Sequence, residues 1–228
     1  MYEKIKNIVK ENFDTALDTG STILGGLFSN ALVGQVAPGI ATVYLGYKQK
    51  RFERNINALG NELKVRIEKL ESSVNNLSNK EVDFLEDHII PIIIDNVQDE
   101  QQEEKIKFII NGLETIIEYR IFDEDLILTY FDILKSLRYK DLKVFISLYN
   151  YEKTSVSTLS EVKKESLPVS NSEEALENHI IKKLKSYNLL TYQKLYGDFT
   201  TDEYKIGADR IKIGMLGRNF VEFIKSKG

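Results

Sequence analysis

Apolar positions recur every three or four residues along most of this chain, the spacing that places side chains on one face of an α-helix. The longest such stripe predicts a helix from Lys48 to Leu77, with apolar residues at Phe52, Ile56, Leu59, Leu63, Ile67, Leu70, Val74 and Leu77. A stripe of this length needs a partner. We expect packing against the helices that follow, and a coiled-coil dimer is the alternative.

Residues 78–151 carry further stripes and predict a compact bundle of about four helices. Ser78 and Glu81 have the spacing of a capping box, so a helix should begin there. Pro91 should break or kink the helix within an apolar stretch. The acidic segment from Gln98 to Glu104 is typical of a solvated loop and the first turn of a helix.

The most unusual segment is a run of 29 residues, Thr19 to Tyr47, that lacks Asp, Glu, Lys, Arg and His. It follows residues 1–18, whose mixed charges and apolar spacing predict an amphipathic helix, unlike an export signal. A charge-free stretch this long must be buried in protein, inserted in lipid or packed against copies of itself. These three options remain open at the level of the sequence.

Glycines cluster in this run, and Pro38-Gly39 is a turn signal, so the sequence predicts a glycine-rich helical hairpin. Small residues let helix backbones approach closely. If the run spans a membrane, the Lys and Arg residues that follow it place its C-terminal side in the cytoplasm. The residues predicted to serve self-association or membrane attachment are Gly25, Gly26, Gly34, Pro38 and Gly39.

Residues 152–171 lose the apolar periodicity and gain Ser, Thr and Lys, which is typical of a linker. Ser170 and Glu173 can then open another helix. Two short stretches suited to β structure follow, residues 192–197 and 209–217, and a last helix is expected from Arg218. This order predicts a small winged-helix-like α+β module over residues 172–228.

Composition narrows the class of function. The chain has 228 residues, no Cys, two His and a net charge of −4. Without Cys there is no disulfide, thiolate zinc site or thiol nucleophile, which fits a reducing compartment such as a bacterial or phage-infected cytoplasm, with or without membrane association. Neither His88 nor His179 has a metal-site spacing, and no nucleotide-binding or catalytic motif is present. We therefore expect no enzyme, no cofactor and no metal.

The C-terminal module is locally basic, because from His179 onward ten Lys and Arg face five Asp and Glu. Such an excess permits phosphate contacts, although many winged-helix modules contact only proteins. The candidate contacts to nucleic acid or to a protein partner are Lys182, Lys183, Lys185, Arg210, Lys212 and Arg218.

The layout as a whole resembles the Abi-alpha type of proteins associated with abortive infection and prophages. The resemblance rests on the glycine-rich apolar segment followed by basic residues, the helical middle, and the step formed by Leu216, Gly217, Arg218 and Phe220. It implies a role in conflict between phage and host. It carries no catalytic or binding residue onto this chain.

The expected organisation is mostly α-helical: residues 1–77 with the hairpin and the long helix, a bundle over 78–151, a linker over 152–171 and the C-terminal module. The leading hypothesis is a non-enzymatic, homo-oligomeric protein of prophage or phage-defence type. It acts by self-association or membrane attachment through the glycine-rich segment and recognises a protein partner through the module. The alternative is a cytosolic DNA-binding transcriptional regulator in which the apolar run is core.

Overall fold

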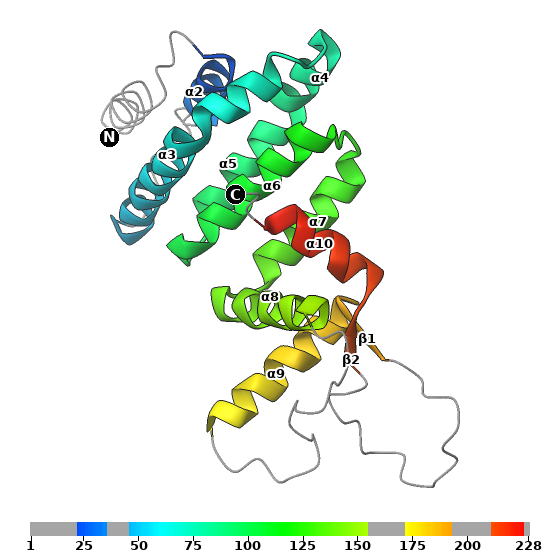
Figure 1. Cartoon of the computed structure of the whole chain (residues 1–228). Helices are drawn as coiled ribbons and strands as arrows, with labels where there is room; N and C mark the ends of the chain where they lie inside the picture. Colours follow the sequence, from blue (N-terminus) through cyan, green and yellow to red (C-terminus); the bar gives the residue numbers. More distant parts are fainter. Residues whose placement is uncertain (1–21, 36–45, 155–171, 193–210, 226–228) are drawn as a thin grey trace, which may run out of the picture. The chain divides into compact units, whose positions relative to one another are not determined.

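The computed structural model describes residues 22–35, 46–154, 172–192 and 211–225 and is mostly helical, with one small antiparallel sheet (Figure 1). The predicted helical class is therefore confirmed. In chain order the elements are α2 (Ile23–Gln35), α3 (Gly46–Val74), α4 (Asn79–Phe84), η1 (Leu85–Ile89), α5 (Ile90–Asp99), η2 (Glu103–Lys105), α6 (Ile106–Tyr119), α7 (Glu124–Ser136), α8 (Tyr139–Thr154), α9 (Ser172–Ser186), β1 (Leu190–Tyr192), β2 (Ile211–Ile213) and α10 (Met215–Ile224).

The described residues form two compact units. Unit 1 consists of the described residues within Met1–Ser136 and Phe223–Gly228. Unit 2 consists of the described residues within Leu137–Glu222. Helix α8, which the sequence grouped with the bundle, thus belongs to the same unit as α9 and the sheet. It runs to Thr154, so the first residues of the predicted linker are helical, and the others lie outside the described ranges.

Helix α6 lies at the centre of unit 1, and every residue from Asn111 to Ile117 is buried. The long helix α3 packs along α6 and α5, as its apolar stripe predicts. Leu59, Leu63 and Leu70 of that stripe are almost completely inaccessible to solvent. Apolar burial of this kind is the main favourable contribution to folding.

The break predicted at Pro91 is a local widening of the helix. Residues Leu85–Ile89 form a π-helical turn, and α5 starts at Ile90, which leaves Pro91 in the first turn of α5. A proline donates no backbone N–H, and its ring collides with the carbonyl four residues earlier. The wider turn directly before Pro91 accommodates that ring without ending the helical path.

The predicted capping box opens α4. The backbone N–H of Ser78 donates to Oε2 of Glu81 at 2.7 Å, and the Ser78 hydroxyl donates to the same oxygen at 2.8 Å. These hydrogen bonds lower the pKa of Glu81, chiefly through the backbone N–H. Because they favour the carboxylate, acidification through that pKa removes the contribution of the cap to stability.

Arg120 ends α6 in the left-handed conformation, with φ 52°. Its guanidinium donates to the Asn76 carbonyl at 2.7 Å and lies 3.4 Å from Glu81. One side chain therefore joins the end of α6 to the turn between α3 and α4. These contacts offset the strain of a left-handed residue that is not glycine.

In unit 2, β1 pairs with β2 in antiparallel register, from Leu190 opposite Ile213 to Tyr192 opposite Ile211. The first strand begins two residues before the predicted stretch, and residues 193–210 lie outside the described part of the chain. The last helix begins at Met215, earlier than expected. Helix, strand pair and helix follow in the predicted order, whereas a wing is not described.

The start of α10 passes close to the end of α9. A Cβ atom at Gly217 would overlap the Leu189 carbonyl oxygen, whose backbone is held by a hydrogen bond from Gly214 N at 2.9 Å. Backbone at this distance has little freedom to retreat. Gly217 is therefore required by packing.

We expect Gly217→Ala to destabilise the protein by about 1–3 kcal/mol, the usual effect of overpacking. Met215→Ala in the same helix is the control: Met215 is 75% exposed and its truncation should change stability by no more than about 0.5 kcal/mol. Chemical denaturation followed by circular dichroism measures both. Equal stabilities of the two variants would contradict the close approach.

Candidate functional site

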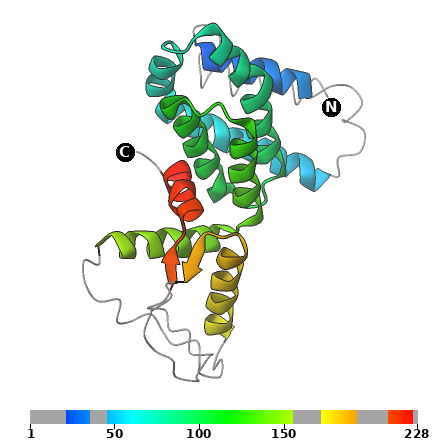
Figure 2. The same cartoon turned by 90° about the vertical axis from the view of Figure 1, so that its right-hand side faces the viewer.

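One face of α2, which lies within the charge-free run, is buried in protein. Helix α2 packs against α3 and α5 of unit 1 (Figure 1, Figure 2). The contact face consists of large apolar side chains that are almost fully buried: Leu24, Leu27, Phe28 and Leu32. In the described part of the chain no helix combines the length and the apolar character needed to cross a membrane.

A carboxylate from another helix holds the beginning of α2. The oxygens of Glu71 on α3 accept hydrogen bonds from Leu24 N at 2.7 Å and Ile23 N at 3.1 Å. Thr22 adds its hydroxyl oxygen, which accepts from Gly25 N at 3.2 Å. The first backbone N–H groups of a helix have no partner within it, and negative charge there is favourable. Glu71 of α3 thus provides the negative charge that the N-terminus of α2 lacks in its own sequence.

The five residues predicted for self-association lie in different environments. Gly25 is buried, Gly26 is partly exposed and Gly34 lies near the end of α2, whereas Pro38 and Gly39 fall outside the described residues. A Cβ atom at Gly26 would meet no atom within 4 Å. The described part of the fold therefore gives no steric reason for glycine at this position.

The outward face of α2 carries no charge. Thr22, Gly26 and Ser29 are partly exposed, and Ile23 and Asn30 are exposed. All are uncharged, and most are small. This face, which we call the outer α2 face, contrasts with a protein in which 29% of residues are charged.

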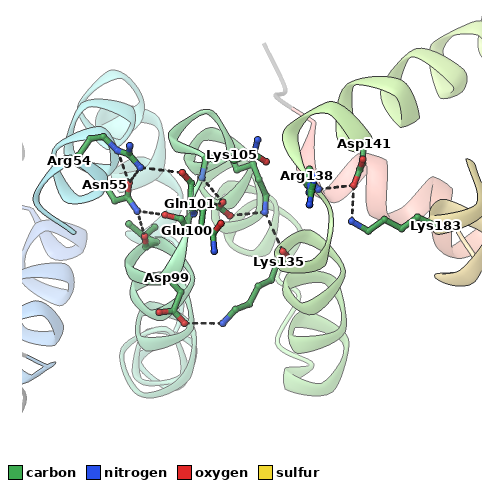
Figure 3. Close-up of polar contacts among 12 residues, drawn as sticks. Arg54, Asn55, Asp99, Glu100, Gln101, Lys105, Lys135, Arg138, Asp141 and Lys183 are labelled. Atoms are coloured by element: carbon green, nitrogen blue, oxygen red, sulfur yellow. Dashed lines mark hydrogen bonds and ion pairs between the residues drawn. The ribbon is translucent and has the colours of Figure 1, made fainter. Parts of the chain in front are cut away.

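Two of the predicted basic contact residues are paired inside unit 2. Lys183 Nζ lies 2.8 Å from Asp141 Oδ2, which also accepts from the backbone N–H of Arg138 at 2.8 Å (Figure 3). Asp141 is 4% exposed, so this pair is largely removed from water. Lys183 therefore neutralises the carboxylate that caps the start of α8.

Arg218 has a comparable role. Its guanidinium lies 2.5 Å from Glu152 Oε1, and Glu152 Oε2 accepts from the backbone N–H of Ile213 on β2 at 3.0 Å. Of the other predicted contacts, Lys182 is exposed, Lys185 and Lys212 are partly exposed, and Arg210 lies outside the described residues. Two of the five described cations are therefore engaged by carboxylates of the same unit.

A polar cluster in unit 1 was not predicted. Asn55 of α3 is completely buried, and its amide nitrogen donates to the carbonyls of Val97 and Glu100 at 2.8 Å each (Figure 3). These carbonyls belong to the last turn of α5. Its amide oxygen accepts from Arg54 at 3.1 Å. Asn55 therefore caps α5 from the neighbouring helix.

The same turn contains a buried ion pair. Lys105 Nζ lies 2.7 Å from Glu100 Oε2, and the two side chains are only 3% and 9% exposed. Glu100 Oε1 accepts from the backbone N–H groups of Gln101 and Gln102 at 2.8 Å each. The predicted solvated segment does expose Gln101, Glu103 and Glu104, and a helical turn starts at Glu103. Glu100 is the exception, because it finds enough donors to replace water.

A second ionic group joins α3 to α6. Lys69 Nζ lies 2.5 Å from Glu114 and 2.7 Å from Glu118. Glu114 is buried apart from 4% of its surface. The hydrogen bond to Glu114, followed by that to Glu118, raises the pKa of Lys69. Like the Asn55 cluster, this arrangement satisfies buried polar groups.

None of these three polar groups in unit 1 has the geometry of a metal centre. Among the described residues, no group of three or more His, Asp or Glu side chains could hold a metal ion. Comparison with protein-family models, curated proteins and solved structures gave no match. Two candidate functional surfaces remain, the outer α2 face and the surface of unit 2. Both are argued from their geometry alone.

The hydrogen bonds of Asn55 predict that truncating its side chain lowers the stability of unit 1. Asn55→Ala should destabilise unit 1 by about 1–3 kcal/mol, because it removes the side-chain donor that the carbonyls of Val97 and Glu100 share. Asn57→Ala, an exposed position on the same helix, is the control. Urea denaturation measures both variants. A neutral Asn55→Ala would mean that water reaches the turn.

The pairing of Lys183 predicts how unit 2 responds to loss of charge. Lys183→Met should lower the free energy of unfolding by about 1–3 kcal/mol, measured by urea denaturation, since Asp141 loses its cation. Lys182→Met, the control, should be neutral.

The same pairing predicts weak binding to nucleic acid. Fluorescence anisotropy with duplex DNA should detect only weak binding that disappears near about 0.15 M salt. Nanomolar, sequence-selective binding at that salt concentration would instead favour the transcriptional regulator.

Proposed function

We propose that this chain is a non-enzymatic binding protein, in which copies associate through the outer α2 face and unit 2 recognises a protein partner. The observation that carries the first part is Gly26, a helical glycine with open space beside it. Glycine within a helix costs about 1 kcal/mol relative to alanine. Close approach of a second helix gives a physical reason for that cost.

Association of copies fits the character of this face. Thr22, Gly26 and Ser29 are small and uncharged, so two such faces can approach without desolvating ions or displacing long side chains. A second copy presents the same face, and a two-fold axis through it gives a self-complementary contact. A charged partner would find no counter-charge here.

Recognition of a protein by unit 2 is supported by its surface. Lys183 and Arg218 already neutralise acidic groups of the same unit, which reduces the charge offered to phosphates. Three large apolar side chains are exposed instead, on α8, α9 and α10: Tyr151, Leu176 and Met215. Tyr and Met are enriched at protein interfaces. From the resemblance to Abi-alpha-type proteins we propose that this activity serves phage–host conflict in a bacterial cytoplasm.

The decisive test is Gly26→Leu, measured by sedimentation equilibrium of the full chain. The parent should form a dimer or larger oligomer, and the variant should dissociate at least about tenfold more readily, equivalent to about 1.4 kcal/mol. The open space beside Gly26 accommodates the Cβ atom of the leucine, so the circular dichroism spectrum should be retained and the melting temperature should not fall.

Two variants serve as controls for this test. Val65→Leu changes an exposed apolar position on α3 and should leave the oligomer unchanged. Gly26→Ala should stabilise the monomer by about 0.5–1 kcal/mol through helix propensity. A monomeric parent, or equal masses for the parent and Gly26→Leu, would refute self-association. Co-sedimentation of a monomeric parent with anionic lipid vesicles would assign the face to membrane attachment.

A further inference from the structure

The first turn of α2 has a complete set of hydrogen bonds. Gly26 N donates to the Thr22 carbonyl at 3.1 Å and closes the turn, so the N–H groups of residues 23–25 have no acceptor within the helix. The Glu71 carboxylate accepts from the first two of these groups, and the Thr22 hydroxyl accepts from the third. Two of the three acceptor atoms therefore belong to a residue of α3.

The sequence of α2 does not stabilise this turn by itself. The turn contains no acidic residue, and its third and fourth positions are both glycine, Gly25 and Gly26. Glycine lowers helix stability, and a helix of 13 residues is marginal in isolation even when its sequence is favourable. The first turn of α2 therefore depends on contacts with other helices.

The apolar contact face of α2 holds the later turns more firmly than the first. Of its four large buried side chains, only Leu24 belongs to the first turn, and the other three follow it. Ile23, the other large apolar residue of that turn, is 40% exposed. Loss of the Glu71 contact should therefore loosen the first turn while the rest of α2 stays packed on unit 1.

The carboxylate of Glu71 is committed to α2. Among the described residues, its only partners are the backbone N–H groups of Ile23 and Leu24. A negative charge at this position is favourable because of the helix dipole, and hydrogen bonds to a charged acceptor are stronger than those to a neutral one. The charge of Glu71 thus acts at one place, the start of α2.

We propose that Glu71 is the positioning residue of the outer α2 face. The first turn carries Thr22 and Gly26 of that face, and a second copy can pack closely against them only while the turn is helical. Because Glu71 holds the turn, it sets the fraction of molecules that are ready to associate. This inference rests on the proposed self-association through α2 and adds the residue that controls it.

The size of this control follows from the population of the helical turn. An apparent dissociation constant is the intrinsic constant divided by the fraction of molecules in the binding-competent state. In a symmetric dimer this fraction enters once for each copy. If removal of the Glu71 charge leaves the turn helical in about one molecule in three, the dissociation constant of the dimer rises about tenfold.

Sedimentation equilibrium of the full chain measures this effect in Glu71→Gln. Glutamine keeps the size of the side chain, removes its charge and replaces one acceptor oxygen by an NH2 group that cannot accept. The dissociation constant should rise at least about tenfold relative to the parent. Glu68→Gln is the matched control, because it removes the same charge from an exposed position on the same helix, and it should change the constant by less than about twofold.

Amide hydrogen exchange followed by NMR measures the cap without the association. It is carried out in a Gly26→Leu background, which weakens association, with and without Glu71→Gln. The amides of Ile23 and Leu24 should exchange at least about tenfold faster when Glu71 is replaced, because their acceptor is lost. The amide of Leu63, in the middle of α3, should be unaffected.

Circular dichroism establishes that each variant is folded. If Glu71→Gln is not, Glu71→Asp replaces it, because its carboxylate is one methylene further from α2. Faster exchange at Ile23 and Leu24 with an unchanged dissociation constant is the result expected of a merely structural cap, and it would overturn the proposal. An equal rise of the constant in Glu68→Gln, or a rise in Glu71→Gln without faster exchange, would also overturn it.

The experiment also separates this proposal from the self-association on which it rests. A monomeric parent would refute self-association through the outer α2 face, and the role of Glu71 with it. A parent that associates, and that dissociates on Gly26→Leu but not on Glu71→Gln, would refute only the role of Glu71.

Discussion

The burial of α6 is the constraint on which the rest of unit 1 depends. This helix contacts protein on nearly all sides, yet it carries Asn111, Glu114 and Thr115, whose polar atoms have lost water. Polar groups in such a position must find partners in the chain. The partners come from α3 for Glu114 and from the carbonyls of Phe223 and Ile224 for Thr115 and Asn111.

The same rule operates at the helix ends. Glu71 caps α2, Asn55 caps α5 and Asp141 caps α8, and only Asp141 is close in sequence to the helix it serves. Capping from another helix couples secondary structure to tertiary packing, because the end is stable only when its neighbour is in place. In unit 2 the basic residues Lys183 and Arg218 are used in this way, which explains why a local excess of positive charge need not form a binding surface.

Much of the helical fold could be predicted from the sequence. The stripe of α3 and the capping box at Ser78 are local patterns, and both were read correctly because each involves residues three or four apart. The buried roles of Asn55, Lys105 and Asn111 could not be predicted, since a polar residue on a helix normally indicates a solvated face. The backbone carbonyls to which Asn55 and Asn111 donate are 42 to 113 residues away in the sequence.

The candidate surfaces were located only in part for the same reason. Gly26 was named as a contact residue from composition, but the open space beside it became visible only once α2 had been placed against α3 and α5. Lys183 and Arg218 were named from charge alone, and their acidic partners on α8 lie 42 and 66 residues away. Charge counts do not distinguish a cation that faces solvent from one already neutralised.

Arg120 has a consequence for engineering this protein. A left-handed residue at a helix end is the position where protein engineers routinely introduce glycine to gain stability. Here that replacement would relieve the backbone at φ 52° while deleting the side chain that holds Asn76 and Glu81. A consensus rule based on backbone angles alone would therefore choose the wrong residue, because the strained arginine serves as the joint between three helix ends.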